Sequence, residues 1–190
     1  MSQSDSNNHL LMSPARIDRI ITRIAYQIHE HTRGSDELVV MGIDERGFYL
    51  AQRLAERLSM IYQVGIAAHP VWVKNADKPN AIIDSAEKSK DEIAIADKPM
   101  PSVKGKKVVI VDDVMYSGKT MYVALQKITE NESPDEITLA ALIDRGHRRY
   151  PLNLQYVGLY CPTKLQEHVH CNFSQGDSNG VWLFYSSDQE

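Results

Sequence analysis

The segment 108–120, VVIVDDVMYSGKT, constrains the fold more than any other part of the chain. Its four leading apolar residues are typical of a strand that is buried on both faces of a parallel sheet. Two adjacent carboxylates follow, at the end of a strand where ligands bind in open α/β sheets. The Ser-Gly-Lys-Thr stretch then opens a helix, which we expect to run from Gly118 to about Glu130. A loop of this kind offers N–H groups, hydroxyls and the positive end of a helix to a phosphate.

Several interpretations of the segment 108–120 can be compared. A capped helix after a plain turn explains the serine and glycine, but two adjacent carboxylates after a buried strand are costly unless they are used. A Walker A loop is excluded because the GxxxxGK[ST] spacing is absent. Coordination of Mg²⁺ by Asp112 and Asp113, as in a phosphatase, stays open. Carboxylates beside a phosphate-binding loop suit a sugar phosphate, because they can accept hydrogen bonds from its hydroxyls.

The rest of the chain predicts alternating helices and strands. A helix begins at Ser13-Pro14, with serine as N-cap, and stops near Gly34. A second amphipathic helix opens at Gly47. Buried strands are expected at 38–43, 107–111 and 137–143, an edge or irregular strand at 64–73, and weaker strands at 156–160 and 181–185. Residues 1–12 read as a loose tail and 74–106 as a long surface loop. This order is typical of an α/β fold with a mainly parallel sheet.

Composition narrows the class of protein. The 190 residues carry 21 basic and 25 acidic side chains, so the net charge of −4 excludes a globally basic nucleic-acid binder. No apolar run approaches the roughly 20 residues of a membrane span, and the start lacks the apolar core of a signal peptide. The two cysteines, Cys161 and Cys171, fit no paired metal or redox motif. We therefore expect reduced thiols in a cytoplasmic protein with no membrane partner.

The 108–120 segment resembles the signature of the type I phosphoribosyltransferases, which has four apolar residues, two acids, three mostly apolar residues, Thr or Ser, Gly, any residue and Thr. The resemblance implies that family's α/β fold, with a mainly parallel central sheet flanked by helices and a small hood. It implies one domain over residues 13–190, with the hood formed by about 151–190 and N-terminal elements. It also implies phosphoribosyl pyrophosphate (PRPP) as substrate. Asp112 and Asp113 would bind its ribose hydroxyls, and the loop would bind its 5′-phosphate through Val114, Met115, Tyr116, Ser117, Gly118, Lys119 and Thr120.

A second glycine-bounded stretch, Gly42–Gly47, lies after the first predicted strand. By its chemistry it is either a tight turn with a surface arginine or another anion loop. In the family this stretch is the pyrophosphate loop, so the resemblance places Ile43, Asp44 and Glu45 in the PRPP site and Arg46 against the leaving group. Arginine suits this role because its planar fork binds phosphate oxygens in pairs.

The segment 143–152, IDRGHRRYPL, together with Tyr156-Val-Gly158, Pro162-Thr163 and Thr22–Ala25, resembles the PyrR group of this family. These are bifunctional pyrimidine-operon attenuation regulators and uracil phosphoribosyltransferases. The resemblance implies Mg²⁺-dependent transfer of ribose 5-phosphate to uracil or a similar base, with Mg²⁺ held mainly by PRPP rather than by protein ligands. The base would lie against Asp144, Arg145, Val157 and Gly158. The chain departs from the group at Val73–Asn75, where Lys74 is expected to contact pyrophosphate, and at Leu159–Cys161, where the group's lysine is missing.

An alternative function is regulation through RNA. In the PyrR group a basic dimer surface binds an mRNA stem-loop, and here arginines gather in two segments although the net charge is negative. The RNA-binding candidates are Arg19, Arg23, Arg148 and Arg149. Ordinary solvated arginines would explain the same pattern. The alternative is thus an RNA-binding attenuation regulator that senses UMP or UTP with weak or no catalysis, and the group implies a homodimer or larger assembly.

Overall fold

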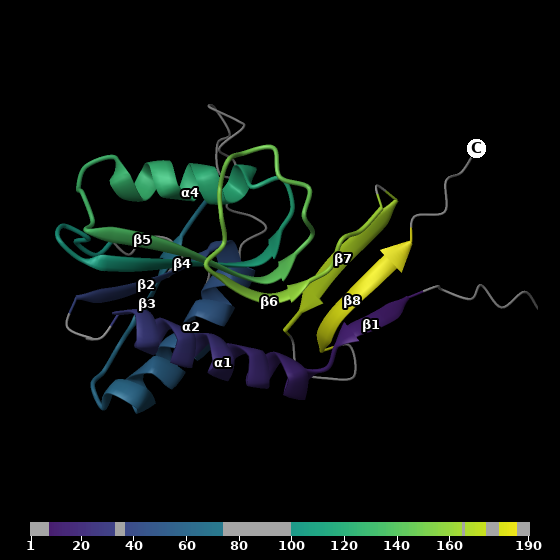
Figure 1. Cartoon of the computed structure of the whole chain (residues 1–190), viewed down its shortest axis with the longest axis horizontal. Helices are drawn as coiled ribbons and strands as arrows, with labels where there is room; N and C mark the ends of the chain where they lie inside the picture. Colours follow the sequence, from purple (N-terminus) through teal and green to yellow (C-terminus); the bar gives the residue numbers. More distant parts are fainter. Residues whose placement is uncertain (1–7, 33–36, 74–99, 165, 174–178, 186–190) are drawn as a thin grey trace, which may run out of the picture.

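The computed structural model describes residues 8–32, 37–73, 100–164, 166–173 and 179–185. A five-stranded parallel sheet forms its centre, in the order β3-β2-β4-β5-β6 (Figure 1). Its strands are β2 (Leu38–Ile43), β3 (Ala68–Val71), β4 (Lys107–Met115), β5 (Glu136–Asp144) and β6 (Tyr156–Tyr160). The predicted α/β fold with a mainly parallel sheet is confirmed.

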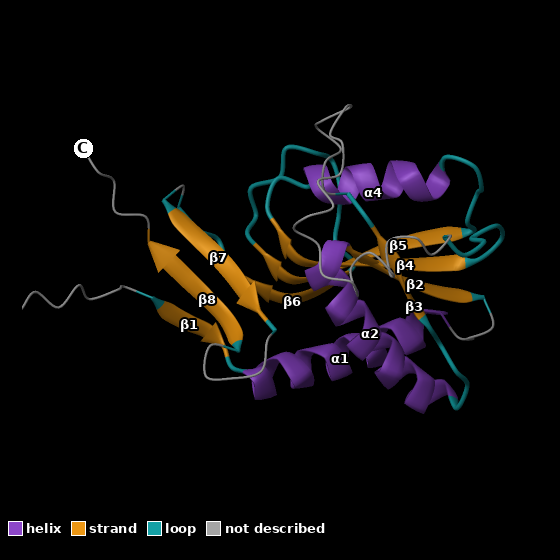
Figure 2. Cartoon of the chain, turned by 180° about the vertical axis from the view of Figure 1, so that it is seen from behind, coloured by secondary structure: helices purple, strands orange, loops and turns teal. Residues whose placement is uncertain are grey.

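Helices cover both faces of this sheet. Helices α1 (Pro14–Thr32) and α2 (Asp44–Tyr62) lie on one face, and α4 (Lys119–Thr129) lies on the other (Figure 2). Alternate residues of the strands enter the two cores: Val109 and Val111 of β4 pack with α1 and α2, while Val108 and Ile110 pack with α4. Strands buried on both faces must be apolar at every position, which explains their continuous apolar runs.

Helix α1 begins as predicted. The Arg16 backbone N–H lies 3.4 Å from Ser13 Oγ, as in an N-cap, and the stripe of isoleucines from Ile17 to Ile28 is buried. The described part of the helix reaches Thr32, whose hydroxyl bonds to the Ile28 carbonyl. The predicted stop at Gly34 lies outside the described residues. This apolar stripe packs α1 against α2 and the sheet.

The edge strand β3 is shorter than the predicted strand 64–73. It pairs in parallel with β2 and places Pro70 opposite Gly42. Because β3 pairs on one side only among the strands that the structure describes, a residue without an N–H is tolerated there. Of the predicted long loop 74–106, only residues 100–106 lie in the described part of the chain.

A second, antiparallel sheet has the order β1-β8-β7, with β1 (His9–Met12), β7 (Glu167–Asn172) and β8 (Gly180–Tyr185). The expectation of a loose tail over residues 1–12 is wrong for residues 9–12, because they pair with β8. Strand β7 was not predicted, since its sequence EHVHCN is largely polar. The strand predicted at 156–160 is confirmed as β6, which pairs with β5 at the edge of the main sheet.

Candidate functional site

The paired carboxylates lie inside β4, not after it. The strand continues to Met115, which pairs with Asp144 of β5, so the predicted strand end at residue 111 is wrong. Asp112 is buried, and its Oδ1 accepts the Asp113 backbone N–H at 2.9 Å. Asp113 Oδ1 in turn accepts the Val114 N–H at 2.9 Å. Both carboxylates are thus held by the local backbone near the carboxyl end of the strand.

Burial raises the pKa of the Asp112 carboxyl well above its usual value, and the negative charge of Asp113 raises it further. Asp44 adds a smaller repulsion in the same direction. A protonated Asp112 carries an O–H that can donate a hydrogen bond, whereas an ionised carboxylate only accepts. A ligand that donates hydrogen bonds from hydroxyls or brings positive charge therefore stabilises the ionised form of this pair.

The corner between β2 and α2 is tighter than the sequence indicated. Helix α2 begins at Asp44, directly after the strand, so the predicted loop 42–47 is absent and the predicted helix start at Gly47 is wrong. Asp44 has a φ of +50°, and its Oδ1 accepts the Val73 N–H at 2.8 Å. A Cβ on Gly47 would lie 2.7 Å from the Val111 carbonyl oxygen. The glycine thus lets the first turn of α2 approach β4 closely.

This close approach places Arg46, the positively charged residue of the β2–α2 corner, near the acidic pair. Arg46 Nη1 lies 3.8 Å from Asp113 Oδ2, and half of the Arg46 side chain is exposed. Glu45 is exposed, and Ile43 is buried in the sheet core. Lys74, the other predicted pyrophosphate contact, lies outside the described residues. Arg46 can therefore reach both the carboxylates and an anion in solvent.

The β4–α4 loop, residues 116–118, has the conformation that a short strand-to-helix turn requires. Gly118 has a φ of +86°, in the left-handed region that favours glycine, and α4 begins at the next residue. The Lys119 N–H is 3.3 Å from Ser117 Oγ. The Ser117 carbonyl accepts the N–H groups of Arg149 and Tyr150 at 2.9 and 3.2 Å. The segment after β5 thus fixes this loop, a connection that sequence reasoning did not identify.

Asp144 ends β5 beside this loop, and Arg145 is the first residue after the strand. The Asp144 carboxylate accepts the Gly146 N–H at 3.0 Å and pairs with Arg148 at 2.6 Å. The Arg145 backbone N–H donates to the Met115 carbonyl at 2.9 Å, which places Arg145 next to the β4–α4 loop. Asp144 is therefore a buried acid with a neutralising partner.

The other two predicted base-binding residues lie in β6. The carbonyls of Val157 and Gly158 accept hydrogen bonds from Arg23 Nη2, at 2.7 and 3.1 Å. A Cβ on Gly158 would be 2.3 Å from the Leu142 carbonyl oxygen and 2.9 Å from the Ile20 side chain. Gly158 is thus required by the packing of β6 against β5 and α1, whatever else it binds.

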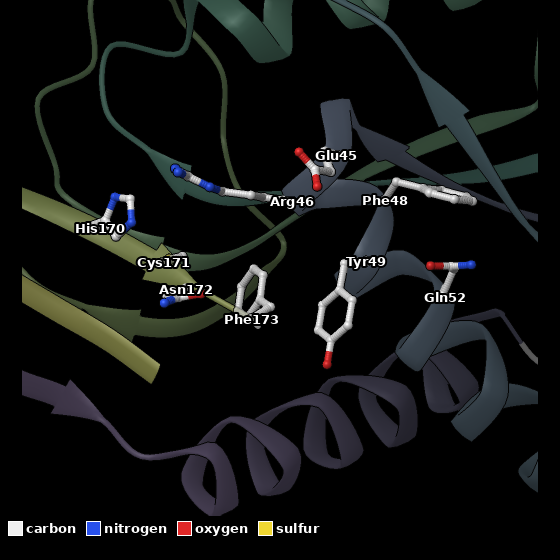
Figure 3. A pocket seen from close by; sticks show the side chains of 9 residues that line it. All are labelled: Glu45, Arg46, Phe48, Tyr49, Gln52, His170, Cys171, Asn172 and Phe173. Carbon is white, nitrogen blue, oxygen red and sulfur yellow. The ribbon is translucent and has the colours of Figure 1, made fainter. Parts of the chain in front are cut away.

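Beside the acidic pair, a cavity of about 480 Å³ opens between α2 and β7 (Figure 3). The rings of Tyr49 and Phe173 stack in its wall with centroids 4.9 Å apart. Cys171 of β7 is buried there, and the pKa of its thiol is raised by burial and then by the charge of Asp113. Sequence reasoning missed these residues because β7 carries no pattern that places it beside β4. The cavity is lined by Glu45, Arg46, Phe48, Tyr49, Gln52, His170, Cys171, Asn172 and Phe173.

No cluster of three or more His, Cys, Asp or Glu side chains within the described ranges is arranged to hold a metal ion. None of the helices in that part of the chain is long and apolar enough to cross a membrane.

Comparisons with known proteins agree with this architecture. A model of the phosphoribosyl transferase domain matches residues 9–171. The chain is 39% identical over 171 residues to the bifunctional protein PyrR of Brevibacillus brevis, covering 90% of this chain and 93% of that one. It is 33% identical over 181 residues to the bifunctional protein PyrR of Bacillus subtilis, covering 94% and 97%.

Solved structures agree at the level of the fold. A hypoxanthine phosphoribosyltransferase from Staphylococcus aureus matches with a TM-score of 0.67 at 16% identity, covering 98% of both chains. The hypoxanthine phosphoribosyltransferase of Trypanosoma cruzi matches with a TM-score of 0.67 at 17% identity, covering 94% of this chain and 97% of that one. The fold expected from the 108–120 segment is confirmed.

Proposed function

The chain belongs to the phosphoribosyl transferase family, within its PyrR group, and we propose that it transfers ribose 5-phosphate from PRPP to uracil or a similar base, releasing pyrophosphate. One observation carries this proposal. Two adjacent carboxylates, the buried Asp112 and the partly buried Asp113, lie on the strand that leads directly into the β4–α4 loop. A sugar phosphate offers hydroxyls to the first feature and an anion to the second.

Each part of PRPP has a counterpart in these residues. The ribose 2′- and 3′-hydroxyls would hydrogen-bond to Asp112 and Asp113. The 5′-phosphate would lie on the β4–α4 loop at the N-terminus of α4, where backbone N–H groups and the helix dipole favour an anion. Val114 and Met115 lead into this loop, and Lys119 and Thr120 form the first turn of α4. The pyrophosphate would lie along the β2–α2 corner, from Ile43 to Glu45, against Arg46.

The reaction needs little covalent help from the protein. The bond between ribose C1 and pyrophosphate breaks while a base nitrogen attacks C1, through a transition state with oxocarbenium character. The protein holds the two reactants in line and keeps water from C1, which are the large contributions available to such a reaction. Arg46 would stabilise the charge that develops on the leaving group. Lys74 is proposed as a second cation for the same group.

Mg²⁺ fits this site as a companion of the substrate. The side chains that could bind the metal are two carboxylates on one strand. Among the described residues, no third His, Cys, Asp or Glu side chain completes a metal-binding group with them. Mg²⁺ commonly uses one or two carboxylates together with substrate phosphates and water. When bound with PRPP, it would neutralise charge on the pyrophosphate. Asp112 and Asp113 are the residues that could contact it.

The base is proposed to lie near the carboxyl ends of β5 and β6. Asp144, with Arg145, Val157 and Gly158, is the candidate set. Uracil is favoured because the relatives at 31–39% identity are PyrR proteins. Asp144 can accept an N–H of the base once its pairing with Arg148 loosens. Turnover of uracil, hypoxanthine, guanine and orotate with PRPP and Mg²⁺ tests this assignment, and no turnover with any of them would refute the enzymatic proposal.

A second function, binding of an mRNA stem-loop, is supported by the word bifunctional in the names of the relatives and by two of the four candidate arginines. Arg19 and Arg149 are exposed, which suits contact with phosphates. Arg23 and Arg148 already bind β6 and Asp144, so their contribution requires rearrangement. Gel-shift assays with pyrimidine-leader RNA, with and without UMP, test this proposal. Binding that is absent or independent of salt would refute it. The proposed assembly is a homodimer or larger oligomer.

A further inference from the structure

Arg145 is buried, although arginine is rarely buried unless it is paired. It is 8% exposed and stands at the end of β5. Within the described residues, no ion pair joins its guanidinium to a carboxylate. A buried charge is costly unless its donors are satisfied, so the contacts that replace an ion pair define what this side chain does.

Two hydrogen bonds tie the Arg145 guanidinium to the chain that leads into β7. Its Nε donates to the Thr163 hydroxyl at 2.7 Å, and its Nη2 donates to the Glu167 carbonyl at 2.6 Å. Thr163 lies in the segment between β6 and β7, and Glu167 is the first residue of β7. Arg145 therefore links the end of the main sheet to the start of the small one.

The face of the same guanidinium lies against the β4–α4 loop. Its central carbon is 4.4 Å from the centroid of the Tyr116 ring, within the range of a cation–π contact. His147 packs against the same ring at 5.1 Å and hydrogen-bonds to the Thr163 carbonyl. Arg145 and His147 thus hold Tyr116 while both are anchored at Thr163. Because Tyr116 is the first residue of the loop, its position bears on the backbone that follows.

We propose that Arg145 is a positioning residue for the 5′-phosphate site: by clamping Tyr116 to Thr163 and Glu167, it holds the β4–α4 loop in the shape that receives PRPP. This inference rests on the proposed function and changes the role of one residue within it. A guanidinium that stacks on the loop and donates to Thr163 and to the first residue of β7 acts on PRPP through Tyr116. In the alternative, Arg145 turns to the base and contacts it directly.

The two roles differ in the kinetic constant that they affect. Loss of a loop clamp weakens PRPP binding and raises KM for PRPP by about 10- to 100-fold, the size expected for a site displaced by a fraction of an ångström to 1 Å. KM for the base should then stay within about 2-fold of wild type, because the contacts that bind the base are unchanged. Loss of a base contact would give the reverse pattern.

Arg145→Met is the central variant, because it removes the charge and the donors but keeps an unbranched apolar side chain. Tyr116→Ala, which removes the ring that the guanidinium contacts, should reproduce its effect. Arg145→Met combined with Tyr116→Ala should be no worse than the more affected single variant, since both break one contact. Arg145→Lys keeps the charge but loses the planar fork, so it should rescue only partly.

Arg53→Met is the matched control. Arg53 also lies over a tyrosine ring, that of Tyr49 at 5.8 Å, and also has a hydrogen-bonded partner, Asp18 at 3.0 Å. It lies on α2 away from the β4–α4 loop, so KM for PRPP should not change. If Arg145→Met does not fold, Thr163→Val removes only the acceptor of the Nε bond and should still raise KM for PRPP.

The results separate the two proposals. A rise in KM for the base with an unchanged KM for PRPP would overturn the positioning role and leave the proposed function standing. The positioning role would also be overturned if the two substitutions acted independently, so that the double variant raised KM for PRPP by the product of the two single-variant increases. If wild-type protein turns over no base, the dissociation constant for PRPP measured by calorimetry replaces KM in the same comparison. Wild-type protein that neither turns over nor binds PRPP would overturn both proposals.

Discussion

Replacing Gly42 with alanine tests the tight corner between β2 and α2. A Cβ at this position would lie 2.3 Å from Phe48 Cα and 2.5 Å from both the Gly47 carbonyl oxygen and the Phe48 nitrogen. Ordinary contact begins at 3.4 Å, so the nearest atom is 1.1 Å too close. All three are backbone atoms in the first turns of α2, which cannot rotate away as a side chain could. The start of the helix must therefore move by about 1 Å if the fold survives.

The loss of stability can be bracketed from two opposing effects. Overpacking of a core costs roughly 1–3 kcal/mol, and backbone contacts place this case at the upper end. Alanine regains about 0.5–1 kcal/mol because glycine is unfavourable within a strand. We expect a net loss of about 2 kcal/mol in the free energy of unfolding. For a chain of this size, that lowers Tm by about 4–8 °C.

The same displacement should reduce catalysis, because Arg46 lies on the turn that moves and is 3.8 Å from Asp113. A misplacement of about 1 Å can cost about 100-fold in rate. Thermal unfolding and steady-state phosphoribosyl transfer are measured on Gly42→Ala and on Gly65→Ala. A Cβ at Gly65 meets nothing within 4 Å, so this control should be as stable and active as wild type. A Gly42→Ala protein with unchanged Tm and unchanged turnover would refute the assignment of this glycine to a close approach.

Three further predictions concern the acids and the core. Asp112→Asn should gain stability relative to wild type as pH rises above the usual pKa of a carboxyl, by about 1.4 kcal/mol for each pH unit over which only the folded wild-type carboxyl stays protonated, since its pKa is raised by burial. Denaturant unfolding at several pH values measures this, and a pH-independent difference would contradict it; the same variant should lose PRPP binding. Glu132 accepts hydrogen bonds from the Ser102 hydroxyl and from the N–H groups of Val103 and Lys104, and the Val103 bond lowers its pKa. Its stabilisation should therefore fade as pH drops below its usual pKa. Glu132→Gln should lower Tm more at pH 7 than at pH 3, which paired melting curves at the two pH values can contradict. Ile28→Ala empties a fully buried site in α1 and should cost about 2–5 kcal/mol in urea unfolding, whereas the exposed Tyr26→Ala should cost far less.

Local sequence pattern predicted most of the elements that carry the site. The apolar run of β4, the isoleucine stripe of α1 and Gly118 before α4 each express a local requirement, namely burial on two faces, burial on one face and a left-handed backbone. Element boundaries were less predictable. The start of α2 at Asp44 depends on contact between Gly42 and the backbone of Phe48, and that contact exists only once the helix has folded back on the sheet.

The amino-acid sequence alone reveals the paired acids on a buried strand, the glycine that turns into α4 and the arginine at the β2–α2 corner. These features follow from side-chain chemistry and short-range periodicity, which any reader of the chain can inspect. The folded chain was needed to show that Cys171 of β7 lies beside Asp113, that residues 149–150 fix Ser117, and that Arg145 stacks on Tyr116. Each of these contacts joins segments far apart in the chain. Their meeting depends on the order of the strands and the packing between two sheets, which local pattern does not encode.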